Sequence, residues 1–153
     1  MPKMDLVGYC GLHCGACGIY QGRIKQAVEN LRKAMGAYGF DKMAPELAQW
    51  EPSLKHYPEF EQVTDGIVKL FGGCPACTGG GGDPTCPIRE CAKPKGYATC
   101  AECSEMDKCD KLQQREWALK GLKQVKEQGV QNWAEEMEKK VAAGYCYLDE
   151  KRE

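Results

Sequence analysis

The stretch CPACTGGGGDPTCPIRECAKPKGYATCAECSEMDKC, residues 74–109, holds seven of the chain's eleven cysteines, five of its glycines and four of its prolines. No helical or alternating apolar pattern runs through it, so we do not expect apolar burial to order it. Ordering so long a loop costs much conformational entropy, which a structural zinc site can offset by about 10 kcal/mol. The sequence therefore predicts that sulfur ligation of a metal ion organises this segment.

The cysteines of this segment are spaced symmetrically: a CxxC pair, eight residues, a cysteine, four residues, a cysteine, eight residues and a second CxxC pair. They are Cys74, Cys77, Cys86, Cys91, Cys100 and Cys103, and Cys109 follows. A CxxC pair lets two thiolates bind one ion from a tight turn, and two pairs complete a tetrahedral site. The glycine run TGGGGDP, residues 78–84, is interpreted as a slack connector between ligands. It is not a phosphate-binding loop, because it lacks the Lys and Ser/Thr that follow the last glycine of such a loop.

A second group of cysteines opens the chain in YCGLHCGACGIY, residues 9–20, where Cys10, Cys14 and Cys17 form a CxxxCxxC motif. A helix is predicted to begin just after it, and its N-terminal dipole favours thiolates. The same spacing holds a [4Fe–4S] cluster in radical enzymes that cleave S-adenosylmethionine. Those enzymes have a longer chain and usually an aromatic residue before the last cysteine, where this chain has Ala16. Zinc and an iron–sulfur cluster both stay open for this trio.

The two histidines and the last cysteine are weaker candidates. His13 lies between two cysteines of the opening motif, whereas His56 lies far from any cysteine. The simpler interpretation of each histidine is a polar side chain near the surface. Cys146 is interpreted as a small buried apolar residue. The predicted metal ligands are Cys10, Cys14, Cys17, Cys74, Cys77, Cys86, Cys91, Cys100, Cys103 and Cys109.

Outside the cysteine motifs, apolar residues recur at the steps of three and four that indicate helices. The predicted helices cover residues 24–38, 60–71, 110–128 and 130–143, and glycines follow the first three. Pro45, Pro52 and Pro58 are expected to divide the region between the first two into short helical pieces. No segment shows the alternation typical of a strand.

These patterns predict a mainly α fold, a small helical bundle with an irregular cysteine-rich metal-binding segment. We expect a single domain over residues 1–153. Its parts would be a helical half at 1–73, the cysteine-rich segment at 74–109 and a C-terminal helical hairpin at 110–153.

The charges of the chain are nearly balanced, with 21 basic and 22 acidic side chains and a formal net charge of -1. We therefore expect neither nucleic acid nor a membrane as a partner. No apolar run approaches the roughly 18 residues of a membrane span, and no signal peptide pattern is present. A cytoplasmic location follows as an expectation, and reduced thiols there favour metal over disulfides.

The joint order of the motifs CGLHCGAC, GGCPAC and CPIRECAKPKGYATCAECSEMDKCDKL resembles the bacterial and archaeal family known as domain of unknown function 3795. The resemblance covers residues 9–112 and implies a zinc-binding protein without an established reaction. Besides the ten cysteines, it marks Gly11, Leu12, Ile88, Arg89, Lys95, Gly96 and Glu102. Many relatives have a proline before the last cysteine, where this chain has Lys108.

The predicted function is a cytoplasmic Zn²⁺-binding protein of structural or interaction type that presents a surface to a protein partner. The alternative is an iron–sulfur redox protein with a [4Fe–4S] cluster on the same thiols, since soft thiolates bind either metal. Nucleic-acid binding through zinc knuckles would rest on Arg89, Lys93 and Lys95 alone. Arg89 is also a candidate N–H donor to a metal thiolate. No catalytic constellation is evident, so no reaction is assigned.

Overall fold

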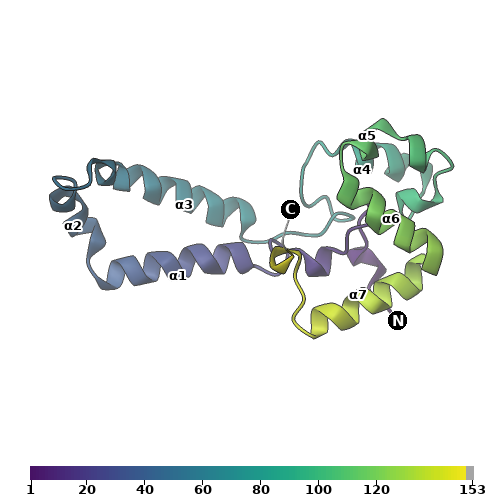
Figure 1. Cartoon of the computed structure of the whole chain (residues 1–153), viewed down its shortest axis with the longest axis horizontal. Coiled ribbons are helices and arrows are strands. Elements are labelled where there is room, and N and C mark those ends of the chain that lie inside the picture. Colours follow the sequence, from purple (N-terminus) through teal and green to yellow (C-terminus); the bar gives the residue numbers. More distant parts are fainter. Residues whose placement is uncertain (151–153) are drawn as a thin grey trace. The chain divides into compact units, whose positions relative to one another are not determined.

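A computed structural model describes residues 1–150, which fold into helices and turns (Figure 1). These residues form seven α-helices, several 3-10 turns and no β-strand, apart from an isolated antiparallel bridge between Val7 and His13. The predicted mainly α fold is confirmed. No helix among residues 1–150 is both long enough and apolar enough to cross a membrane.

The chain divides into two compact units. We call Gly22–Gly73 the arm, and Met1–Gln21 together with the residues from Cys74 onward the core unit. The opening cysteine motif therefore belongs to the same unit as the cysteine-rich segment, and the arm contains no cysteine. The expectation of a single domain stays a prediction.

The arm is a helical hairpin with a short helix near its turn (Figure 1). Its α-helices are α1 Arg23–Ala37, α2 Phe40–Leu47 and α3 Tyr57–Phe71, with the 3-10 turn η3 at Pro52–His56. Gly39 turns the chain between α1 and α2 with a φ of 64°, which glycine adopts without steric strain. An ion pair between Arg32 and Asp65 connects α1 to α3.

The prolines of the arm act differently from the sequence prediction. Pro45 lies inside α2, so the expectation that it divides the helical structure is wrong. Pro58 is the second residue of α3, where a proline loses no intrahelical hydrogen bond. This explains why α3 starts three residues before the predicted helix at 60–71.

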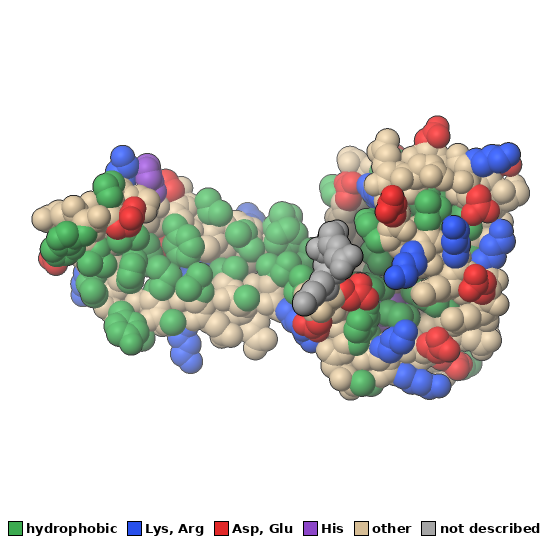
Figure 2. Space-filling view, in the orientation of Figure 1, with side chains coloured by type: hydrophobic (Ala, Val, Ile, Leu, Met, Phe, Trp, Pro, Cys, Tyr) green, Lys and Arg blue, Asp and Glu red, His purple; other side chains and the backbone are tan. Residues whose placement is uncertain are grey.

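The arm buries very little of its apolar surface. Only Ala44 and Thr64 are buried among its residues. Figure 2 shows hydrophobic side chains along the visible face of the arm. The arm therefore has an exposed apolar face instead of a core of its own.

Three helices follow the cysteine-rich segment in the core unit: α5 Asp110–Gln113, α6 Glu116–Gln128 and α7 Val130–Ala142. The prediction of one helix over residues 110–128 is wrong, because the chain breaks at Gln114 and Arg115. Leu112 is 1% exposed and Ala118 is fully buried. Both pack into one apolar cluster, and the break lets α5 and α6 each turn its apolar side toward it.

Two apolar clusters form the interior of the core unit, and α6 contributes to both. One consists of Val7, Ala16, Val125, Trp133, Ala134 and Met137, the other of Ile88, Met106, Leu112, Ala118 and Leu122. The N-terminal segment crosses α6 in close contact. A Cβ atom on Gly121 would lie 2.4 Å from the carbonyl oxygen of Gly11, so this crossing requires glycine.

The cysteine-rich segment folds into short helical turns. They are α4 Pro87–Ala92 and the 3-10 turns η4 Lys93–Lys95, η5 Cys100–Glu102 and η6 Met106–Lys108. Ile88 is 2% exposed, and Ala92 and Met106 are each 1% exposed. The expectation that apolar burial has no part in ordering this segment is therefore wrong.

Candidate metal centre

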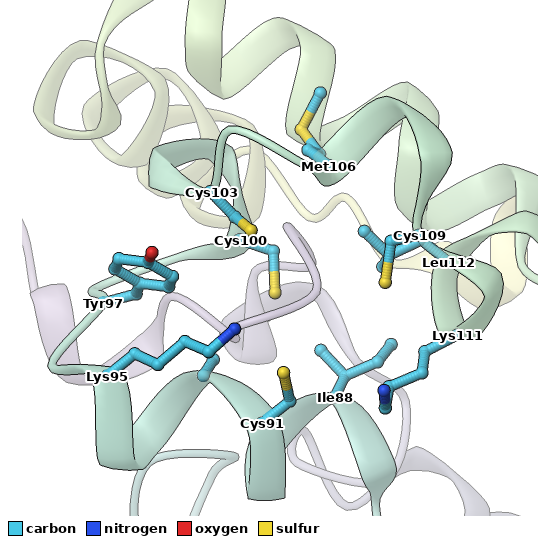
Figure 3. A pocket seen from close by; sticks show the side chains of 11 residues that line it. Ile88, Cys91, Lys95, Tyr97, Cys100, Cys103, Met106, Cys109, Lys111 and Leu112 are labelled. Carbon is cyan, nitrogen blue, oxygen red and sulfur yellow. The ribbon is translucent and has the colours of Figure 1, made fainter.

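Four cysteines of the core unit surround one small cavity (Figure 3). Its volume is about 30 Å³, and it is lined by Cys91, Cys100, Cys103 and Cys109 together with Ile88, Ala92, Lys95, Tyr97, Met106, Lys111 and Leu112. Figure 3 shows the sulfur atoms of Cys91, Cys100 and Cys109 pointing toward a common space, with Cys103 beside Cys100. We call these four residues the cavity cysteines.

Short helical turns place each of the cavity cysteines. Cys91 lies on α4, which begins with Pro87 in the position that favours helix initiation. Cys100 and Cys103 stand at the two ends of η5, where the Cys103 N–H donates to the Cys100 carbonyl oxygen at 3.1 Å. Cys109 follows η6, and its carbonyl oxygen accepts from the Leu112 N–H at 2.9 Å.

The cavity combines half-buried thiols with one neighbouring cation. Burial raises the pKa of Cys100 to about 12, and the thiols of Cys10, Cys109 and Cys103 contribute to the rise. The negative charge of a Cys91 thiolate, and the hydrogen bond that Lys95 donates to it, raise the pKa of Lys95, with a smaller contribution from Cys103. The ammonium group of Lys95 also lies 5.9 Å from the centre of the Tyr97 ring. Thiolate charge at this cavity would therefore meet a positive side chain.

All eleven cysteines are free thiols, so no disulfide competes for them. Among residues 1–150, no three or more His, Cys, Asp or Glu side chains are placed so that they could hold a metal ion together. The donors nevertheless fit a metal by their chemistry, because four thiols around one cavity form the preferred ligand set of a structural zinc site. Zinc binding stays a prediction.

A second set of thiols lies where the opening motif meets the first CxxC pair. The Cys77 N–H donates to Cys14 Sγ at 3.3 Å. Burial raises the pKa of Cys14 to about 11, and the thiols of Cys77, Cys10 and Cys74 contribute. Cys14 of the opening motif thus neighbours the first CxxC pair, although 63 positions separate it from Cys77.

The two remaining predicted ligands are Cys17 and Cys86. Cys17 is half-buried at the end of the 3-10 turn η2, Cys14–Ala16. Cys86 caps α4, and a guanidinium nitrogen of Arg115 lies 4.0 Å from its sulfur. Sequence reasoning missed Arg115, and no motif marks it, because the contact depends on how α4 and α6 pack.

His13 is buried at 1% exposure, so its interpretation as a surface residue is wrong. Neither ring nitrogen has a hydrogen-bond partner among the described residues. The ring meets the Trp133 ring edge-on, with 6.0 Å between their centres, and burial lowers the pKa of His13. The side chain of His56 is 63% exposed, and Cys146 is fully buried as expected.

Arg89 does not act as the thiolate donor suggested by the sequence. Its guanidinium donates to the carbonyl oxygens of Gly81, at 2.7 Å, and Asp83. The Gly81 N–H in turn donates to the Ala76 carbonyl oxygen at 2.7 Å, and the Thr78 hydroxyl donates to the Asp5 carbonyl oxygen at 2.7 Å. The glycine run is therefore fixed by hydrogen bonds, and its interpretation as a slack connector is wrong.

The described part of the molecule is thus helical, and all eleven free thiols lie in its core unit. Residues 6–114 match the family described as Protein of unknown function (DUF3795), so the chain belongs to that family, as its motifs predicted. Neither the curated proteins nor the solved structures give a match.

Proposed function

We propose that the protein is a zinc-binding protein of structural or interaction type. The observation that supports this proposal is the gathering of Cys91, Cys100, Cys103 and Cys109 around one small cavity. Bound zinc would supply a tetrahedral cross-link between chain segments that already pack on one apolar cluster. The residues 74–109 would then owe part of their order to the ion.

The chemistry of the cavity favours a structural site over a catalytic one. Four thiolates would complete the coordination of Zn²⁺, which leaves no open position for water or substrate. Their charge would exceed that of the ion, and Lys95, which already lies beside Cys91, would offset part of the excess. No reaction is proposed for this site.

We also propose a cytoplasmic location and a protein partner. The arm supports a partner, because Tyr38, Trp50 and Leu70 are 79%, 78% and 71% exposed. Exposed apolar side chains of this size commonly mark interaction surfaces. An oxidising compartment would convert the free thiols to disulfides, which would compete with metal.

Metal analysis of protein purified without air tests the proposal. We expect bound zinc in the wild type and the loss of one equivalent in Cys103→Ser. Cys17→Ser, which changes a half-buried thiol outside the cavity, is the matched control and should keep the wild-type content. Retention of all zinc by Cys103→Ser would contradict the proposal. A brown protein with broad absorption near about 400 nm would assign the thiols to an iron–sulfur cluster instead.

A further inference from the structure

We infer that Cys10, Cys14, Cys74 and Cys77 form a second metal centre, distinct from the cavity cysteines, which cross-links the start of the chain to the cysteine-rich segment. This inference rests on the proposed function, because it assumes that the thiols bind metal. It goes further by dividing the ten predicted ligands into two sets of four and two thiols that belong to neither. The spacing of the cysteines in the sequence does not provide this division.

The first observation is the hydrogen bond between the backbone of the CxxC turn and the opening motif. The Cys77 N–H donates to Cys14 Sγ at 3.3 Å, across 63 positions of the sequence. Backbone N–H donors to sulfur are the usual outer-shell contacts of metal-bound thiolates, because they stabilise the charge on the sulfur. The turn is thus already oriented toward Cys14.

The second observation is the fit of two glycines against these cysteines. A Cβ atom on Gly8 would lie 3.7 Å from both Cys10 Sγ and Cys77 Cβ, so these two residues flank the same backbone position. A Cβ atom on Gly81 would lie 2.6 Å from Cys74 Sγ, a distance that no real side chain adopts. The glycine run therefore approaches Cys74 as closely as its backbone allows.

The third observation is the backbone of the CxxC turn itself. Ala76 has a φ of 66°, the only positive φ outside glycine among residues 1–150. A left-handed conformation costs a residue with a Cβ atom about 1–2 kcal/mol, so the surroundings must hold it. The hydrogen bonds of Ala76 and Cys77 help to hold this left-handed conformation. Two sulfur–metal bonds from the same turn would stabilise it further.

The four thiols of this set have the chemistry of a zinc ligand set. Each is free and half-buried. Cys77 neighbours Cys14 through its N–H and Cys10 through Gly8, and Cys74 is its partner in the CxxC pair. A shared cation would stabilise four thiolates so placed.

Cys17 and Cys86 are left outside both centres. Cys17 follows the turn η2, and the sulfur of Cys86 lies 4.0 Å from a guanidinium nitrogen of Arg115. The opening motif is therefore divided, with two ligands and one spare thiol. A radical-enzyme cluster would instead need all three of its cysteines on one site.

Metal content measured on matched variants tests the division. We expect about two zinc ions per chain in the wild type and in Cys17→Ser, but about one in Cys14→Ser and in Cys103→Ser. Cys14→Ser and Cys17→Ser make the same change three positions apart in one motif. Cobalt substitution provides a second readout, since loss of one centre should halve the thiolate-to-cobalt absorption.

A variant that fails to fold would not end the test, because alkylation of the zinc-loaded wild type reports on the same division. We expect Cys10, Cys14, Cys74 and Cys77 to resist a thiol reagent until zinc is chelated, while Cys17 reacts before chelation. Mass spectrometry of the peptides identifies each modified cysteine.

The outcomes separate this inference from the proposed function. One zinc per chain that is lost in Cys103→Ser but kept in Cys14→Ser would overturn the second centre and leave the proposed function intact. Loss of an equivalent in Cys17→Ser or Cys86→Ser, with retention in Cys14→Ser, would overturn the assigned ligand set. A wild type without bound metal would contradict both proposals.

Discussion

Lys95 places a positive charge beside Cys91 and Cys103, and its position suggests a test at the scale of one side chain. Lys95→Gln should lower zinc affinity about two- to fivefold, the usual range for an exposed charge pair. Lys95→Arg keeps the charge and should bind zinc as the wild type does. Competition with a coloured zinc chelator measures both variants. An equal loss of zinc affinity in the two variants would show that the charge of Lys95 does not contribute to zinc binding.

Buried thiols give the metal-free protein a predictable dependence on pH. Cys10 and Cys14 have pKa values raised to about 11, and Cys100 to about 12, from an ordinary value of 9.0. A raised pKa means that the unfolded chain loses these protons first as the pH rises. Their contribution to stability is therefore constant below about pH 9 and is lost as the pH rises from about 9 toward 12.

Urea unfolding of the chelated, reduced protein at several pH values measures this loss. The urea concentration at the midpoint should decrease as the pH rises above about 9. It should decrease less steeply in Cys100→Ala, which lacks the thiol whose pKa is raised most among these three. Zinc should remove the effect, because bound thiolates carry no proton at either pH. A constant midpoint up to about pH 10.5 would contradict the prediction.

The sequence marks the cysteines as candidate ligands, but it could not predict which of them lie near one another. The CxxC pairs mark Cys74, Cys77, Cys100 and Cys103 by local spacing. Which thiols meet depends on contacts such as Cys77 with Cys14, which no local pattern contains. The burial of His13 was missed for the same reason, because its ring packs against Trp133 from the far end of the chain.

At the scale of elements, the N-terminal segment crosses α6 so closely at Gly121 that glycine is more stable there than a larger residue. Alanine normally improves a helix interior over glycine by about 1 kcal/mol. Gly121→Ala should instead lower the free energy of unfolding by about 1–3 kcal/mol, because its Cβ would lie 2.4 Å from the Gly11 carbonyl oxygen.

Gly66→Ala is the matched control for that substitution. Gly66 lies inside α3, and a Cβ there meets nothing within 4 Å. This variant should be neutral or more stable by up to about 1 kcal/mol. Urea unfolding followed by circular dichroism compares the two. A stabilised Gly121→Ala would show that α6 and the N-terminal segment do not pack as described.

Helical periodicity predicted the long elements well because each keeps one apolar face along its whole length. The helices α1, α3 and α7 all follow such a stripe. The break at Gln114 and Arg115 could not be predicted, because helix-forming residues continue through it and only tertiary packing interrupts them. The short helix α4 was missed because six residues are too few to show a period.

At the scale of the whole molecule, the two units differ in what orders them. The arm has helices but only two buried residues and no cysteine, so its order rests on local helix formation and the pairing of α1 with α3. The core unit has two apolar clusters and all eleven cysteines. Metal removal should therefore destabilise the core unit and leave the stability of the arm unchanged.

Hydrogen exchange measured by mass spectrometry, with and without a zinc chelator, tests this difference within one sample. Peptides from residues 74–109 should lose protection on chelation, because the proposed ligands are drawn from these turns and the opening motif. Peptides from α1 and α3 should exchange at unchanged rates and serve as the internal control. Cooperative loss of protection in both units would show that they unfold together. Unchanged protection of residues 74–109 would show that apolar packing around Ile88 and Met106 is sufficient without metal.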